Sequence, residues 1–252
     1  MNRKGDLSPL YLLILISLLG IGSYAMNRRS FSSKKKQYKQ SNEAIFTQIY
    51  EEMKWNNLES VSGPGSDLIQ TSVIRREIPQ LLRELGVKTL VDAPCGDFYW
   101  MKDLKLDIEK YIGVDIVDEI IMKNRRKYNT DSREFITYDL VTDTLPKADM
   151  ILCRDCFIQL CHEDILEILK QFKKSGAEYL LTTTYTSRTH NKNITNGDFY
   201  PINLQVAPFY FPKPILIINE NCSEENGRFN DKSLALWKLE DIDLNNVLNF
   251  NG

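Results

Sequence analysis

The sequence has almost no excess of charge of either sign. Its 32 basic and 34 acidic side chains leave a formal net charge of -2 at pH 7. Proteins that gather polyanions usually carry a strong positive field, so this balance does not favour nucleic acid as a partner.

Cysteine is scarce, and its number is odd. Five cysteines are scattered over 252 residues, which does not indicate a disulfide framework and fits a reducing compartment better. The spacing of Cys153, Cys156, Cys161 and His162 partly matches zinc ligation. However, Cys153 would end a buried strand and Cys161 falls on the apolar stripe of the next helix, so we expect no metal.

The glycine pattern GxGxxG of tight phosphate-binding loops is absent, and so are internal repeats after residue 42. The missing glycines argue against a tightly cradled pyrophosphate. With 42% hydrophobic residues, the chain can bury the core of one domain of ordinary size, which we place at residues 42–252.

One long uncharged run lies near the N-terminus. Residues 9–26 read PLYLLILISLLGIGSYAM, and a helix of that length spans roughly 27 Å, close to the thickness of a hydrocarbon core. We predict a transmembrane helix at 9–26, an N-terminal flank at 1–8 and a basic juxtamembrane linker at 27–41. The heavier basic flank follows the run, which favours a single-pass membrane protein with a cytoplasmic domain.

A cleaved signal peptide is the alternative for this segment. The small residues Ser23 and Ala25 have the spacing that cleavage after Ala25 requires, and the domain would then be secreted or luminal. The length of the run and the basic residues after it favour the membrane anchor.

Short apolar runs alternate with amphipathic stretches after residue 42, which is typical of an α/β sheet. Strands are predicted at 89–93, 111–114, 133–138, 149–153, 179–184, 215–219 and 233–239. Helices are predicted at 71–85, 117–128 and 162–174, with a further one at 98–104. The last two strands flank a polar turn and are expected to close the sheet as an antiparallel hairpin.

The ends of the first three predicted strands carry polar residues. In an open parallel sheet, a nucleotide-like ligand lies at the carboxyl ends of the strands. The first strand leads into the loop 92–97, DAPCGD. We expect Gly96 to let the backbone approach a ligand, and the helix after the loop to present unpaired N–H groups.

Two more carboxylates follow the next strands. Asp115 lies 19 residues beyond Gly96, where it is expected to accept both ribose hydroxyl protons. Asp139 ends the third strand and is expected near an adenine amino group. An Asp after a strand, taken singly, is more often a helix cap than a ligand contact, but the three strand ends together favour a ligand with ribose and adenine and no phosphate.

The sequence resembles bacterial-type class I S-adenosylmethionine-dependent methyltransferases, whose members carry a loop like residues 91–101, VDAPCGDFYWM. The likeness extends from about Trp55 to Trp237. It includes the segments 59–66 (ESVSGPGS), 111–116 (YIGVDI), 152–156 (LCRDC), 180–184 (LLTTT) and 231–234 (DKSL). The hydrophobic N-terminal run lies outside this shared region.

The resemblance implies a Rossmann-like seven-stranded, mostly parallel sheet with an antiparallel last strand, and bound S-adenosylmethionine. It implies that the loop from Asp92 to Gly96 lies beside the methionine moiety, with Asp115 at the ribose and Asp139 near adenine. The residues implied to contact the cofactor are Asp92, Ala93, Pro94, Cys95, Gly96, Asp97, Asp115, Ile116, Asp139, Cys153 and Arg154.

Methyl transfer is an in-line displacement at a sulfonium methyl, for which the protein mainly supplies alignment. If the acceptor must lose a proton, Asp155 after the fourth strand and His190 after the fifth are the candidate bases. The alternatives are that Asp155 pairs with Arg154 or caps a helix, and that His190 is solvated. The loop from Ser60 to Ser66 is either a lid or a plain connection.

Two other functions stay open. An NAD(P)-dependent oxidoreductase shares the acidic residue after the second strand, and a catalytically inactive membrane-bound adaptor would keep the fold. The sequence does not determine the methyl acceptor, which is a small molecule, a glycan, a lipid or a protein.

Overall fold

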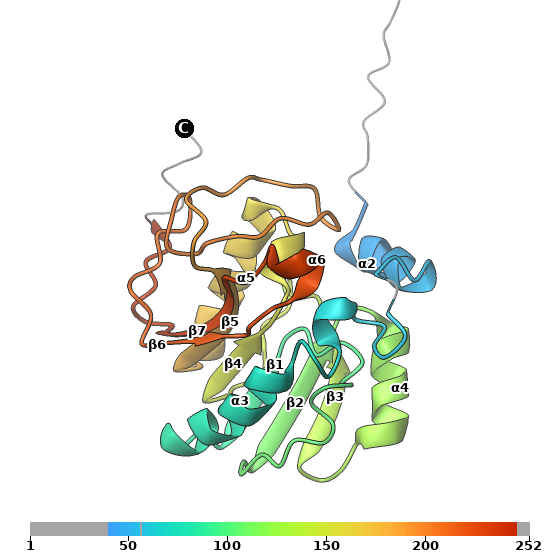
Figure 1. The fold of residues 1–252 in the computed structure, drawn as a ribbon. Coiled ribbons are helices and arrows are strands. Elements are labelled where there is room, and N and C mark those ends of the chain that lie inside the picture. Colours follow the sequence, from blue (N-terminus) through green and yellow to red (C-terminus); the bar gives the residue numbers. More distant parts are fainter. Residues whose placement is uncertain (1–39, 56, 246–252) are drawn as a thin grey trace, which may run out of the picture. The chain divides into compact units, whose positions relative to one another are not determined.

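The computed structural model describes residues 40–55 and 57–245, and their centre is a single seven-stranded sheet (Figure 1). The strands are β1 (Thr89–Asp92), β2 (Lys110–Asp115), β3 (Arg133–Thr137), β4 (Met150–Cys153), β5 (Tyr179–Tyr185), β6 (Leu216–Asn219) and β7 (Lys232–Lys238). The order across the sheet is β3-β2-β1-β4-β5-β7-β6. The strands β1 to β5 run parallel, whereas β7 is antiparallel to both β5 and β6. The predicted mostly parallel sheet with an antiparallel last strand is therefore confirmed.

Residues 1–39 lie outside the described part of the chain, so the flank at 1–8, the transmembrane helix at 9–26 and nearly all of the linker stay predictions. None of the helices within 40–55 and 57–245 is long and apolar enough to cross a membrane.

Helices cover both faces of the sheet. In the part of the chain that the structure describes, the helices of eight or more residues are α2 (Asn42–Glu51), α3 (Ser72–Glu84), α4 (Asp118–Tyr128) and α5 (His162–Ser175). Alternate strand residues face opposite sides. One apolar cluster joins Leu90 to Ile78 of α3 and Ile121 of α4, and the other joins Val91 to Phe172 of α5.

The helix predicted at 98–104 is absent, and turns occupy this segment instead. Phe98 has a φ of 59°, which a right-handed helix does not contain. Its ring is buried against Tyr111 and Phe135, with centroid distances of 5.0 and 5.1 Å. Burial of Phe98, Trp100 and Met101 therefore determines the path of the backbone here, and the prediction was wrong.

Helix α2 was not predicted. Ser41 caps it by accepting a hydrogen bond from the Ala44 N–H at 3.2 Å, a standard way to satisfy the first turn. Phe46, Ile49 and Tyr50 recur at helical spacing, so the sequence contains the signal for this helix.

Candidate functional site

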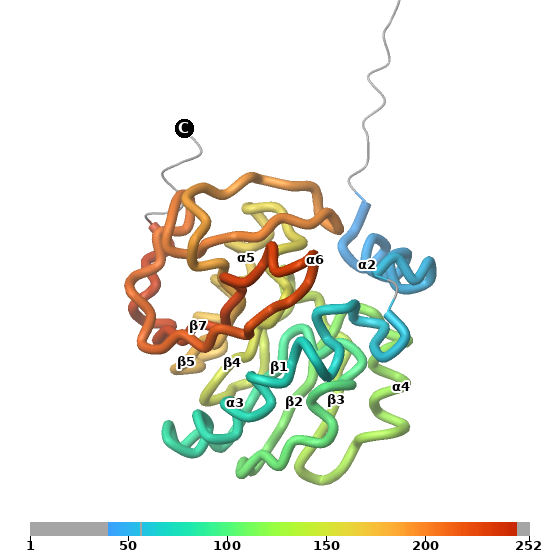
Figure 2. The backbone as a smooth tube through the Cα atoms, in the orientation of Figure 1, coloured from blue at the N-terminus to red at the C-terminus, as the bar shows by residue number. Residues whose placement is uncertain are grey.

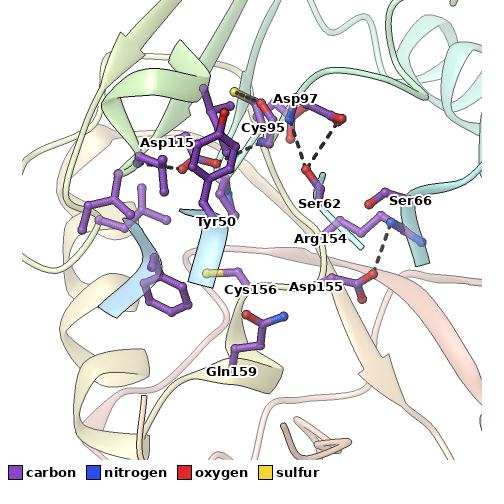
Figure 3. Close-up of a pocket in the computed structure, with 18 of the residues that line it drawn as sticks. Tyr50, Ser62, Ser66, Cys95, Asp97, Asp115, Arg154, Asp155, Cys156 and Gln159 are labelled. Atoms are coloured by element: carbon purple, nitrogen blue, oxygen red, sulfur yellow. Dashed lines mark hydrogen bonds and ion pairs between the residues drawn. The ribbon is translucent and has the colours of Figure 1, made fainter. Parts of the chain in front are cut away.

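A cleft opens at the carboxyl ends of the parallel strands, where β2 and β4 lie on either side of β1 (Figure 3). It encloses about 1120 Å³ including its open mouth. Chain order reverses across β1, which is where ligands bind in open α/β sheets. Asp92, Asp115 and Asp139 all line this cleft, so the three strand ends converge as predicted.

Asp92 ends β1 and is 3% exposed. Burial raises the pKa of its carboxyl from 3.8 to about 7, although the hydrogen bond from Tyr111 opposes the rise. The Tyr111 hydroxyl donates to Asp92 Oδ2 at 2.6 Å. A buried carboxyl with so raised a pKa is costly to ionise, and a cationic ligand would favour its charged form.

Asp115 ends β2 and organises the loop beside it. Its Oδ2 accepts from the Gly96 N–H at 3.1 Å and its Oδ1 from the Val117 N–H at 3.0 Å. Burial raises the pKa of Asp115 to about 6, and these backbone donors limit the rise. Each carboxylate oxygen has a second lone pair, so Asp115 still has acceptor capacity for a ligand in the cleft.

Gly96 lines the cleft, and the structure adds a second reason for glycine at this position. Its φ is 52°, and a Cβ added there would lie 2.1 Å from Ser62 Oγ. The Ser62 side chain therefore occupies the place that a side chain at position 96 would need, and the prediction that Gly96 lets the backbone approach a ligand stays a prediction. The helix expected after the loop is absent, and the Asp97 N–H has a partner, since it donates to Ser62 Oγ at 3.1 Å.

The loop from Ser60 to Ser66 is attached to the floor of the cleft by Asp97 (Figure 3). Asp97 Oδ1 accepts from the Ser60 hydroxyl at 2.9 Å, and its Oδ2 accepts from the Val61 N–H at 3.0 Å. Ser60 and Ser66 are both buried. These contacts favour the reading in which the loop is a fixed wall rather than a moving lid.

The far side of the cleft is apolar around Asp139. Asp139 Oδ1 accepts from the Val141 N–H at 2.9 Å. The side chains of Leu140 and Val141, next to this hydrogen bond, line the cleft. Ile116, predicted as a cofactor contact, lines the same region. This part of the cleft combines a carboxylate with apolar walls, which suits a flat heterocycle carrying an amino group.

Helix α2 covers this apolar end. Asn42, Phe46 and Tyr50, spaced four residues apart, line the cleft from one helix face. The first turn is held by a hydrogen bond from Asn42 Nδ2 to Asp164 Oδ2 at 2.8 Å.

The last turn of α2 is held by α4. Lys123 Nζ donates to the Tyr50 hydroxyl at 2.6 Å, and Tyr50 in turn donates to Glu119 at 3.1 Å. Helix α2, which lines the cleft, is therefore attached at both ends, to α5 and to α4. Sequence reasoning did not identify Phe46 or Tyr50 as site residues.

The opposite end of the cleft contains a buried network of charges. Arg154, which is 6% exposed, binds Glu220 through Nη2 at 2.6 Å and Nε at 3.3 Å. Its Nη2 also donates to the Gly65 carbonyl at 2.7 Å. Arg154 lines the cleft, but its strongest contacts hold β4, β6 and the 60–66 loop together.

Asp155 belongs to this network. Lys232 Nζ lies 2.7 Å and Arg154 Nη1 3.2 Å from Asp155 Oδ2. Burial would raise the pKa of Asp155, but Arg154 and Lys232 outweigh it and lower the pKa. A carboxylate held by two cations is a poor proton acceptor at neutral pH, so these contacts favour the ion-pair alternative over the role of base.

Three residues predicted for the site do not line the cleft. Ala93 and Cys153 are fully buried in the sheet core, because the side chains of successive strand residues face opposite sides. His190 lines a different pocket with Arg188 and Tyr200. The remaining predicted residues are all in the lining: Asp92, Pro94, Cys95, Gly96, Asp97, Asp115, Ile116, Asp139, Arg154 and Asp155.

Within the described residues, no group of three or more His, Cys, Asp or Glu side chains is arranged to hold a metal ion.

No protein-family model and no curated protein matches this chain in sequence. Several solved structures match its fold. One is the magnesium protoporphyrin IX methyltransferase of Synechocystis PCC 6803 with bound S-adenosylmethionine, with a TM-score of 0.53 and 12% identity over 78% of this chain and 96% of that one. The fold is that of the class I methyltransferases.

Two further structures agree. The N-methyltransferase NodS of Bradyrhizobium japonicum with S-adenosylhomocysteine has a TM-score of 0.51 and 13% identity, covering 75% of this chain and 97% of that one. Human N-acetylserotonin methyltransferase with S-adenosylmethionine has a TM-score of 0.51 and 12% identity, covering 79% of this chain and 60% of that one. At such identities the likeness concerns the methyltransferase fold alone.

Proposed function

We propose that this chain binds S-adenosylmethionine in the cleft and transfers its methyl group to an acceptor. The observation that carries the proposal is the convergence of Asp92, Asp115 and Asp139 on one cleft with an apolar end. The fold neighbours with bound S-adenosylmethionine or S-adenosylhomocysteine support the same ligand. An acidic lining suits a ligand with two cationic groups and no phosphate.

The adenosine part fits the end of the cleft that is formed by α2, Asp115 and Asp139. Asp115 retains acceptor capacity for the two ribose hydroxyls. Asp139 would accept from the adenine amino group, and Phe46, Leu140 and Val141, which line the same cleft, would pack against the ring. Helix α2 would then exclude water from this half of the site.

The methionine part fits beside Asp92. A ligand ammonium near Asp92 would stabilise the carboxylate form and lower its pKa from about 7. Ionisation of Asp92 would therefore accompany cofactor binding, and the energetic cost of burying this charge would be offset in the complex alone.

S-adenosylmethionine supplies an activated methyl group on a sulfonium, whose S–CH3 bond breaks as the acceptor atom bonds to the methyl carbon. The protein's own part is to fix the sulfonium and the acceptor in line and to exclude water. The Asp155 carboxylate, paired with Arg154 and Lys232, belongs to a fixed network of compensated charges near this end. We assign it electrostatic positioning and no proton transfer.

Pyrophosphate binding is poorly supported, which argues against a nicotinamide-dependent oxidoreductase. The N–H groups of Cys95, Gly96 and Asp97 already donate to Val114, Asp115 and Ser62. The absence of a helix at 98–104 removes the helix N-terminus that dinucleotide sites use. No observation favours the inactive adaptor.

We also propose that residues 9–26 anchor the protein in a membrane, with the catalytic domain on the cytoplasmic side and a basic linker between them. This proposal rests on the length of the uncharged run and on the basic residues that follow it. The proposed acceptor is a small molecule, a glycan, a lipid or a protein, and nucleic acid is not expected.

The test is to incubate the full-length protein with methyl-labelled S-adenosylmethionine and a membrane-plus-cytosol extract, and to identify the labelled product. We expect label in one class of acceptor, and none with an Asp115→Asn variant. Binding of NADH without any binding of S-adenosylmethionine would overturn the proposal.

A further inference from the structure

A second pocket lies outside the proposed cofactor cleft and shares no lining residue with it. Three segments form it. Residues 187–190 follow β5, residues 199–201 belong to the same long loop, and Glu225, Arg228 and Phe229 come from α6 (Glu224–Gly227) and its exit. In Figure 2 the long loop is the orange part of the tube and α6 the adjoining red part. The pocket encloses about 880 Å³ including open solvent.

Asp231 fixes the shape of this pocket. Its Oδ2 accepts from the Ser187 hydroxyl at 2.6 Å, and its Oδ1 accepts from Arg188 Nη2 at 2.9 Å. The same Nη2 donates to the Arg228 carbonyl at 3.0 Å, while Asn203 Nδ2 donates to the Arg188 carbonyl at 2.8 Å. Arg188 is therefore held in place by both its backbone and its side chain.

The floor of the pocket is aromatic and lies between two guanidinium groups. The Phe229 ring lies 6.0 Å from Arg188 Cζ and 5.6 Å from Arg228 Cζ. Phe199 meets the Phe229 ring edge-on at 5.4 Å and is 48% exposed. The exposed Phe199 ring packs on the Phe229 ring that lies between the two cations, and it offers a surface on which a second ring can stack.

The donors of this pocket are not all used. Arg188 Nε is buried and has no hydrogen-bond partner among the described residues. Arg228 pairs through Nη1 with Glu225 at 2.9 Å, and both side chains are more than half exposed. Arg188 Nε is closed to solvent, so the groups open to a ligand are the exposed part of the Arg188 side chain, which is 29% exposed, and the Arg228 guanidinium. Guanidinium groups match the geometry of carboxylate and phosphate oxygens.

We propose that this pocket is a binding site for a small organic oxyanion attached to an aromatic ring. The oxyanion lies between Arg188 and Arg228, and the ring stacks on Phe199. His190 at the edge of the pocket is part of this site rather than a base for the cofactor cleft. The proposal stands independently of the proposed methyl transfer, because no residue is common to the two sites.

The test is calorimetric titration of the full-length protein with phenyl phosphate, benzoate and inorganic phosphate. We expect both ring-bearing anions to bind at one site. Arg228→Gln is expected to lower the affinity for phenyl phosphate by about tenfold, since a charge-assisted hydrogen bond is lost. The matched control is Arg76→Gln, which removes an equally exposed arginine on α3 and is expected to leave the affinity unchanged.

Phe199→Ala distinguishes a site for a ring-bearing anion from a site for any anion. This variant is expected to lower the affinity for phenyl phosphate and to leave the affinity for inorganic phosphate unchanged. The proposal is overturned if neither ring-bearing anion binds, if Arg228→Gln and Arg76→Gln behave alike, or if S-adenosylhomocysteine displaces phenyl phosphate. Binding of S-adenosylhomocysteine, measured in the same protein, reports separately on the cofactor cleft.

Discussion

The Tyr111 hydroxyl lies 2.6 Å from Asp92 Oδ2 beneath the cleft, and it is the hydrogen bond that supports this buried carboxyl. Burial nevertheless raises the pKa of Asp92 to about 7. A group whose folded pKa exceeds its unfolded value of 3.8 binds its proton more tightly in the folded state. The free energy of unfolding therefore falls as the pH rises from about 4 to 7.

Asp92→Asn is expected to remove the loss of stability that accompanies ionisation of the buried Asp92 carboxyl. At pH 8 the variant should be more stable than the wild type by up to about 4 kcal/mol, from about 1.4 kcal/mol per pKa unit. At pH 4 the two should be equally stable, because Asp92 is then protonated in the folded protein. Thermal unfolding at both pH values checks this, and equal stability at pH 8 would contradict the raised pKa. The variant should also bind S-adenosylmethionine more weakly.

Gly96→Ala should destabilise the protein by about 1–3 kcal/mol, because the position has a positive φ and the new methyl group would meet Ser62. Adding Ser62→Ala should recover part of the loss by removing the Oγ atom. Gly176→Ala is the matched control: its φ is 74° and a Cβ there has nothing within 4 Å, so only the backbone cost remains. Chemical denaturation of the four proteins measures these differences. The steric account fails if Gly96→Ala costs no more than Gly176→Ala.

Arg154→Met should cost about 3–5 kcal/mol, because it leaves Glu220 buried without its bidentate partner. Lys238→Met is the comparison. Lys238 pairs with Glu178 and Glu240, and its side chain is 38% exposed, so its loss should cost less than about 1 kcal/mol. The free energy of unfolding from urea titration tests both variants. Equal effects would show that the buried network does not hold the strands together.

Phe46→Ala should weaken S-adenosylhomocysteine binding by about tenfold, through loss of one apolar wall. It should act mainly on the dissociation rate, since α2 covers the apolar end of the cleft. Gln48→Ala changes an exposed residue of the same helix and is expected to leave binding unchanged. Stopped-flow measurement gives the dissociation rate of S-adenosylhomocysteine for both variants. An unchanged dissociation rate in Phe46→Ala would show that α2 does not contact the bound ligand.

The positions of the strands and of Asp115 and Asp139 followed from the sequence, because apolar runs and the residues that end them are local features. Asp115 comes directly after a run that reads as a buried strand, and the pairing of β2 with β1 then places it beside Gly96. Such positions depend on the period of the pattern and on the topology of parallel sheets.

The features that sequence reasoning missed are contacts between distant segments. Ser62 and Gly96 meet although 34 residues separate them in the sequence, and Arg154 pairs with Glu220 across 66 residues. The turn at Phe98 arises from aromatic packing with Tyr111 and Phe135, which overrides local helix propensity. Helix α2 could have been found, since Ser41 and the spacing of Phe46 and Tyr50 are local signals.

The most direct test of the cofactor site is calorimetric titration of S-adenosylhomocysteine into the full-length wild type and into Asp115→Asn and Asp118→Asn variants. Asp118 is exposed and pairs with Thr137, so its variant is a control three residues away on the same segment. We predict that the wild type and Asp118→Asn bind alike, and that Asp115→Asn, still folded by circular dichroism, loses at least about tenfold in affinity. Unchanged affinity in Asp115→Asn, or no binding to the wild type, would contradict the account.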